Sequence, residues 1–168
     1  MTKDKTLVLV RAGLMAALCC IATMVIKIPT PGTGGYIHLG DAFVVLSGII
    51  LGPVYGALAA GIGSALADLF SGYVAYAPIT MLIKGIIAFV VGLIYHRLKD
   101  KISNDLIRCI LGGLFATAFV AAGYLAYEIL IYGKGAILSV PANLIQGASG
   151  LIISSVLLPT MKRFIVEE

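Results

Sequence analysis

Isolated charged residues stand within long apolar stretches of this sequence, and they are its first candidates for binding chemistry. They are three acids and three lysines, separate from the charged clusters near both ends and around positions 97–108: Lys27, Asp41, Asp68, Lys84, Glu128 and Lys134. A charge at the centre of a membrane helix costs about 2.5–3.5 kcal/mol on insertion scales, so each of these residues needs a physical reason. Snorkelling to lipid headgroups explains Lys27 and Lys134. For Asp68, Lys84 and Glu128, internal ion pairing and ligand binding are both open.

Amide and tyrosine side chains occur in the same parts of the chain. Asn143 and Gln146 are three residues apart, a spacing that places both amides on one face of a helix. That face would serve a ligand or a buried polar network, since lipid contact does not favour amides. The neighbouring tyrosines are Tyr73, Tyr76, Tyr124, Tyr127 and Tyr132. An interfacial tyrosine belt accounts for Tyr132 and one or two of the others.

The segment Pro29–Asp41 is dense in proline and glycine. It stops the preceding helix and cannot cross hydrocarbon unsupported, so we expect it to lie over the helices or fold among them. We expect Asp41 to be the N-cap of the next helix, a role that does not exclude ligand contact. Tyr36 and His38 add an aromatic face and a hydrogen-bonding ring just before it.

The motifs of several catalytic classes are missing from the sequence. It has no GxxxxGK[ST] phosphate loop, and no HExxH or GxSxG motif. The two histidines, His38 and His96, fall on opposite membrane faces in the arrangement predicted below, which argues against a zinc site or a Ser–His pair. The three cysteines have no disulfide or metal-binding spacing and fit small apolar packing positions. We expect no catalytic residue, metal or cofactor.

The composition defines the class of protein that must position these residues. Of 168 residues, 60% are hydrophobic and 12% charged, against about 25% charged residues in an ordinary soluble domain. This excludes a soluble globular protein and a disordered chain. Because a spanning helix takes about 20 residues, the chain holds about six or seven spans. We expect one integral membrane domain over residues 1–168, with no room for a catalytic domain.

Six apolar segments, separated by charge, proline and glycine, predict an all-α bundle of six transmembrane helices. Gly52-Pro53 cuts the second segment early, with only a short turn before the third. Gly48, Gly52 and Gly56 then mark a turn with close backbone approach. The predicted helices are Leu7–Ile28, Asp41–Leu51, Val54–Phe70, Pro78–His96, Leu106–Ile131 and Pro141–Phe164.

The basic residues predict the orientation of this bundle. Nine of the twelve fall on one side of a six-helix arrangement: Lys3, Lys5, Arg11, Arg97, Lys99, Lys101, Arg108, Lys162 and Arg163. By the positive-inside rule that side is cytoplasmic, and so are both termini. The net charge of +4 then reports topology, and nucleic-acid binding is not needed to explain it. The isolated polar residues described above all lie in the external half.

Small residues line the start of the first helix. Ala12 and Ala16 are four residues apart, and Gly13 and Ala17 lie on the adjacent line. This spacing lets two helices approach closely. Packing within the chain and docking of a partner are equally open.

Together these features resemble a known family. The alanine-spaced first helix, the segment Gly35-Tyr36-Ile37-His38-Leu39-Gly40-Asp41, and Gly52-Pro53-Val54-Tyr55-Gly56 are similar to the S component of an energy-coupling-factor (ECF) vitamin transporter. Ala67-Asp68-Leu69-Phe70, Pro78 and Lys84-Gly85 also fit that family. The resemblance covers nearly the whole chain and is greatest to the riboflavin, hydroxymethylpyrimidine and vitamin B6 branch.

The resemblance implies a division of labour in a prokaryotic cell membrane. The S component captures a vitamin with high affinity at the external face; a transmembrane coupling protein docks on the face of Ala12 and Ala16; two cytoplasmic ATPases drive toppling and inward release. The substrate-binding candidates, placed by position, are Tyr36, His38, Asp41, Asp68, Tyr76, Lys84, Tyr124, Glu128, Asn143 and Gln146. The first external loop would be the lid.

Such a pocket suits a small aromatic alcohol, because tyrosine faces supply contact area and a few polar groups fix orientation. We expect vitamin B6 or a hydroxymethylpyrimidine, with riboflavin or another vitamin as the alternative. A solitary carrier and an intramembrane enzyme using Asp41, Asp68 and Lys84 are the competing functions from other classes.

Overall fold

The computed structural model of the chain describes residues 3–30 and 33–165. Its elements in chain order are α1 (Lys3–Val25), β1 (Ile28–Pro29), β2 (Tyr36–Ile37), α2 (Asp41–Phe70), α3 (Ala77–Arg97), α4 (Asp105–Tyr132), the 3-10 helix η1 (Gly133–Ser139) and α5 (Val140–Ile165). Four helical stretches are long and apolar enough to cross a membrane: Lys5–Val25, Asp41–Phe70, Ala77–Arg97 and the run Asp105–Arg163, which η1 divides. The prediction of an all-α membrane protein is confirmed.

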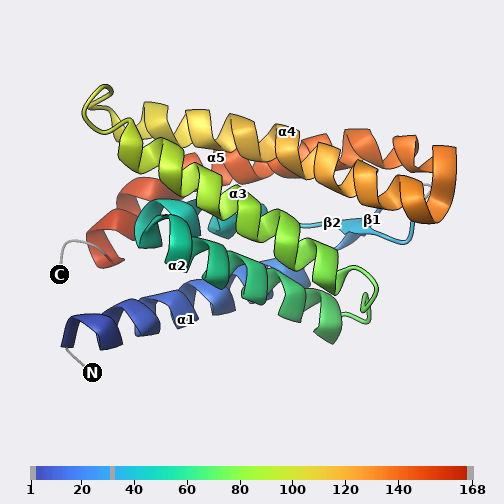
Figure 1. The fold of residues 1–168 in the computed structure, drawn as a ribbon, viewed down its shortest axis with the longest axis horizontal. Coiled ribbons are helices and arrows are strands. Elements are labelled where there is room, and N and C mark those ends of the chain that lie inside the picture. The colour runs from blue at the N-terminus through green and yellow to red at the C-terminus, as the bar shows by residue number, and fades with distance from the viewer. Residues whose placement is uncertain (1–2, 31–32, 166–168) are drawn as a thin grey trace.

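The helices run side by side, so the molecule has two distinct ends (Figure 1). The start of α1, the end of α5 and the loop between α3 and α4 lie at one end, which we call the terminal end. The β1–β2 hairpin, the loop between α2 and α3, and η1 lie at the other, the loop end. The nine clustered basic residues therefore share one end of the bundle. That this end is cytoplasmic remains a prediction from the positive-inside rule.

Helix α2 reverses its direction in the middle. Gly52 has φ 76° and ψ 179°, outside the helical region and in a range that favours glycine, and Pro53 follows it. A Cβ on Gly56 would lie 2.5 Å from the carbonyl oxygen of Ser47, whereas residues nine apart in a straight helix are about 13.5 Å apart. The two halves therefore fold back on each other, and the predicted break and close approach are confirmed.

The two predicted segments on either side of Gly52-Pro53 are counted as one element, α2, although its chain breaks between them. The described residues form five α-helices, and α2 contains both segments predicted as Asp41–Leu51 and Val54–Phe70. The first helix ends at Val25, earlier than predicted, because Ile28 and Pro29 pair with Ile37 and Tyr36 in the short antiparallel hairpin.

Glycines let these helices pack with their backbones in contact. A Cβ on Gly92 of α3 would lie 2.8 Å from the carbonyl oxygen of Gly48, so α3 presses against the first half of α2. A Cβ on Gly63 would lie 2.9 Å from Cα of Ala16, which brings α1 against the second half of α2. Large apolar side chains such as Leu130 and Val156 remain exposed on the outside, as expected for a lipid-facing surface.

Candidate functional site

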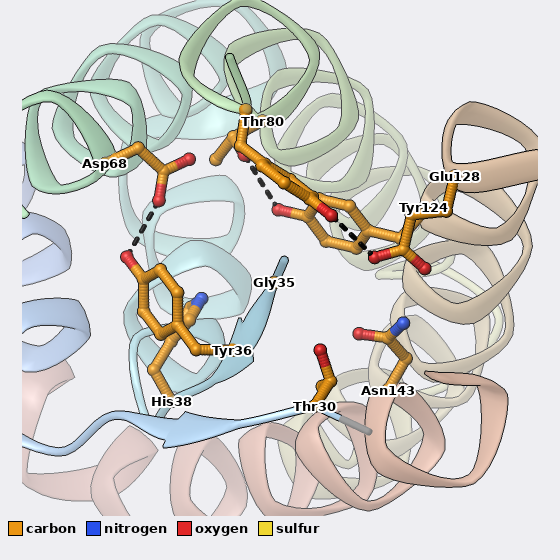
Figure 2. A pocket seen from close by; sticks show the side chains of 10 residues that line it. Thr30, Gly35, Tyr36, His38, Asp68, Thr80, Tyr124, Glu128 and Asn143 are labelled. Atoms are coloured by element: carbon orange, nitrogen blue, oxygen red, sulfur yellow. Dashed lines mark hydrogen bonds between the residues drawn. The ribbon is translucent and has the colours of Figure 1, made fainter. Parts of the chain in front are cut away.

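A small pocket lies at the loop end (Figure 2). The hairpin covers it, and α2, α3, α4 and α5 supply its walls. Seven of the ten predicted substrate-binding residues line it, together with three residues that the sequence did not single out. The lining residues are Thr30, Gly35, Tyr36, His38, Asp68, Tyr76, Thr80, Tyr124, Glu128 and Asn143.

One side of the pocket joins the hairpin to α2. The hydroxyl of Tyr36 donates to Oδ1 of Asp68 at 2.7 Å (Figure 2). The other carboxylate oxygen, Oδ2, is buried and has no hydrogen-bond partner among the described residues. Desolvation and the nearby Asp68 raise the pKa of Tyr36, so its hydroxyl stays protonated and remains a donor. Asp68 therefore offers one free acceptor oxygen.

The opposite side of the pocket is centred on a second carboxylate. Oε1 of Glu128 accepts from the hydroxyl of Tyr76 at 3.1 Å, and Oε2 accepts from Ser139 of η1. Asn143 reaches the same serine at 3.5 Å. Burial raises the pKa of Tyr76, which keeps it a donor to Glu128. A chain of hydrogen bonds thus fixes the carboxylate of Glu128 at the pocket wall.

Directly beneath the pocket is an ion pair between Lys84 of α3 and Asp41 of α2. Lys84 has no exposed surface and Asp41 is 4% exposed. Nε2 of Gln146 donates to the second oxygen of Asp41 at 3.0 Å, and Lys84 also lies 5.2 Å from the ring centroid of Tyr124. The three predicted residues that do not line the pocket are Asp41, Lys84 and Gln146. They form a buried polar cluster next to the lining residues His38 and Tyr124, and we call this cluster the floor.

The end of the hairpin segment is tied to this floor. The backbone N–H of His38 donates to Oε1 of Gln146 at 3.0 Å, and Nδ1 of His38 accepts from the N–H of Gly40 at 3.0 Å. Burial, reinforced by the charge of Lys84, lowers the pKa of His38 to about 3. The imidazole is therefore neutral near pH 7, as its acceptor role requires.

The charge of the site is unbalanced. Asp41 neutralises Lys84 below the pocket, whereas Asp68 and Glu128 line it without a lysine or arginine among the described lining residues. Carboxylates are hydrogen-bond acceptors, as are the tyrosine and threonine oxygens around them. The site is suited to a neutral molecule with an aromatic ring and several hydroxyl or N–H donors.

Comparison with known proteins shows the family to which the chain belongs. A sequence model of the family described as "ECF-type riboflavin transporter, S component" matches residues 3–163. The chain belongs to this family. The S component is also similar to a protein of Pyrococcus woesei described as "Uncharacterized protein in gap 3'region", with 34% identity over 134 residues that cover 79% of this chain and 86% of that protein.

The family match confirms the resemblance found in the sequence, and it sets the class of function. This S component is a substrate-binding subunit of a transporter and a multi-pass protein of a prokaryotic cell membrane. The pocket at the loop end is then its candidate substrate site.

The prediction that Asp41 caps α2 is wrong. The N-cap residue is Gly40, no side chain caps the helix, and Asp41 is its first residue. The carboxylate of Asp41 instead faces inward to Lys84, because an unpaired buried ammonium would be far more costly than an uncapped helix end. Lys27 and Lys134 are exposed, in agreement with a headgroup position.

Sequence reasoning missed Thr30, Gly35 and Thr80. Threonine carries no charge and is common in membrane helices, so its type gave no signal; the position of Thr80 one turn before Lys84 could have done so. Gly35 allows close approach, since a Cβ there would lie 3.2 Å from Oε1 of Glu128.

Lys84 and Asp41 provide a test of the floor. We expect Lys84→Met to lower the free energy of unfolding by about 3–5 kcal/mol, because it leaves Asp41 buried without its counter-charge. The double variant Lys84→Met with Asp41→Asn should recover much of that loss. Thermal unfolding of the purified protein in one detergent measures both effects.

The matched control is Lys134→Met, which removes an exposed lysine and should leave stability nearly unchanged. A Lys84→Met protein as stable as the control, or a double variant less stable than Lys84→Met alone, would contradict the role assigned to the pair.

Proposed function

We propose that this S component binds riboflavin in the pocket beneath the β1–β2 hairpin and supplies it to an ATP-driven importer. The observation that carries the proposal is the pocket itself: tyrosine rings around two carboxylates that no lining cation neutralises. The family description, which names riboflavin, supports the choice of vitamin. The expectation of vitamin B6 or a hydroxymethylpyrimidine gains no such support, and these compounds become competitors in the test below.

The chemistry of riboflavin fits this set of side chains. Its flat ring system can lie against Tyr36, Tyr76 or Tyr124, since aromatic contact supplies area with defined geometry. Its side-chain hydroxyls and ring N–H are donors, which the free oxygen of Asp68 and the carboxylate of Glu128 can accept. A phosphate on the ligand would instead face two carboxylates, which disfavours phosphorylated flavins.

Binding requires the pocket to open. Its free volume is about 20 Å³, enough for about one water molecule and far too little for a vitamin ring. A few polar contacts hold the hairpin segment to the helices: Lys27 bonds to Ser71, Tyr36 bonds to Asp68 at the pocket, and His38 bonds to Gln146 at the floor. We propose that the hairpin is the lid, which lifts to admit riboflavin and closes over it.

Energy for transport must come from partner subunits. The sequence contains no GxxxxGK[ST] motif, and ECF S components work with a transmembrane coupling protein and two ATPases, as the resemblance implied. We propose that α1 is the docking helix. Of its small residues, Ala12 and Ala16 are half-buried, with Ala16 against Gly63, while Gly13 and Ala17 are exposed.

A ligand panel on the isolated protein tests the proposed function. We expect riboflavin to bind without ATP, and flavin mononucleotide, pyridoxine and hydroxymethylpyrimidine to bind at least about tenfold more weakly, a difference of about 1.4 kcal/mol. Tyr36→Phe should weaken riboflavin binding by about tenfold or more, because it removes a hydrogen bond to a carboxylate that holds the lid. Isothermal titration calorimetry gives all of these affinities.

Tyr55→Phe is the matched control, since Tyr55 is 43% exposed and remote from the pocket lining. Tighter binding of pyridoxine than of riboflavin would reject the vitamin assignment. Equal affinities for Tyr36→Phe and the wild type would reject the lid contact.

Docking is tested by enlarging small residues of α1. We expect Gly13→Leu and Ala17→Leu, both at exposed positions, to abolish co-purification with the coupling protein while riboflavin affinity is kept, because close helix approach needs small side chains. Ala12→Leu is the companion variant on the face that the resemblance implies. Val156→Leu, on the exposed surface of α5, is the control, and intact complexes with all three α1 variants would remove the docking assignment.

A further inference from the structure

A second cavity lies at the terminal end, at the opposite end of the bundle from the substrate pocket. It has a free volume of about 190 Å³ between α2, α3, α4 and α5. Its polar lining residues are Tyr95, His96, Lys99, Asp105, Arg108 and Lys162. None of them lines the substrate pocket.

The charges around this cavity do not balance. Asp105 pairs with both Arg108 and Lys162, and Lys99 is a third cation in the lining. Three cationic side chains thus surround one carboxylate. The excess of positive charge favours an anion in the cavity.

Two buried donors at the cavity lack acceptors. Nε of Arg108 and the hydroxyl of Tyr95 have no hydrogen-bond partner among the described residues. Arg108 is 4% exposed and Tyr95 is 5% exposed. The guanidinium is held in place by Asp105, by the carbonyl oxygen of Tyr95 at 3.0 Å, and by the Tyr95 ring, whose centroid is 4.3 Å away. Because buried donors are nearly always paired, this fixed arrangement favours a ligand rich in acceptor oxygens, such as a phosphate group.

A groove of mostly apolar surface lies next to the cationic cavity. It has a free volume of about 300 Å³ and shares Asp105 and Lys162 with the first cavity. Its other walls include Leu106, Leu158 and Pro159. A cationic cavity beside a groove of mostly apolar surface matches an amphiphile with an anionic head and a hydrocarbon tail.

The position in the fold agrees with this ligand. Lys99 lies in the loop between α3 and α4, and Asp105 begins α4. This loop lies at the terminal end with the start of α1 and the end of α5 (Figure 1). The ends of a spanning bundle lie at the level of the lipid headgroups, and basic cavities between transmembrane helices on the cytoplasmic side bind anionic headgroups.

We propose that the cavity and groove at the terminal end form a binding site for one anionic phospholipid. Its phosphate lies among Lys99, Arg108 and Lys162 and accepts from Tyr95, and an acyl chain follows the groove past Leu106. The lipid would hold α3, α4 and α5 together at the end opposite the substrate pocket.

Lipid retention measured by native mass spectrometry tests the site. The purified protein is exchanged into mixed micelles with either phosphatidylglycerol or phosphatidylcholine. We expect one phosphatidylglycerol per chain to be retained, and phosphatidylcholine to be retained at least about tenfold less. Lys99→Gln with Lys162→Gln should reduce retention of phosphatidylglycerol by about tenfold or more.

The matched control is Arg97→Gln with Lys101→Gln, which removes the same charge from exposed positions at the same end but outside the cavity lining. It should retain the lipid. Circular dichroism and gel filtration establish that both double variants are folded, and Leu106→Gln, at an exposed groove position, should weaken retention if the acyl chain contributes.

Three outcomes would overturn the proposal. Equal loss in the two double variants would show a general surface-charge effect. Equal retention of phosphatidylglycerol and phosphatidylcholine would show no headgroup selectivity. Inorganic phosphate that raises the unfolding temperature as much as phosphatidylglycerol at the same concentration would show a free-anion site without a lipid.

Discussion

The buried pair between Lys84 and Asp41 is the constraint on which the substrate end of the molecule depends. An ammonium with no exposed surface must be neutralised within the protein, since removing one partner of such a pair leaves an uncompensated charge in a low-dielectric interior. Asp41 can neutralise Lys84 because α2 begins at Asp41 and its chain reverses direction at Gly52. Gln146 donates a hydrogen bond to the second carboxylate oxygen of Asp41. One electrostatic requirement thus brings the start of α2, the middle of α3 and the start of α5 to one point.

The same point anchors the hairpin segment that we propose as the lid. His38 bonds to Gln146 and Gly40 bonds to His38, so the segment that enters α2 is fixed to the floor. The pocket-facing part of the hairpin is held to the helices by Tyr36 and Asp68. If the bond between His38 and Gln146 stays in place, the proposed lid would open by breaking the bond between Tyr36 and Asp68. Because Asp41 neutralises Lys84 at the floor, the carboxylates of Asp68 and Glu128 remain available as hydrogen-bond acceptors at the pocket wall.

The sequence located much of the candidate pocket because polar side chains are rare in its apolar segments. Seven of the predicted residues line the pocket, and their contact with a substrate stays a prediction: Tyr36, His38, Asp68, Tyr76, Tyr124, Glu128 and Asn143. The distinction between wall and floor could not be predicted, because it depends on which side chains face one another across helices far apart in the chain. Thr80 was not recognised as a site residue because its hydroxyl carries no charge. The prediction that Asp41 caps α2 failed because its ion pair with Lys84 stabilises the protein more than a helix cap would. The fold was also predicted in part. The Gly52-Pro53 pair in the sequence correctly located the reversal of α2. The pairing of Ile28 with Ile37 could not be predicted, because a hydropathy pattern does not show which residues pair in a hairpin.

The central claim, that riboflavin is held beneath the hairpin, is tested most directly by hydrogen–deuterium exchange of the purified protein with and without the vitamin. The account predicts that riboflavin slows exchange most strongly in the hairpin, from Ile28 to Thr30 and from Gly35 to His38, and leaves the loop at 98–104 unchanged. Protection confined to the terminal end, or no change in the hairpin at a saturating concentration of riboflavin, would contradict it.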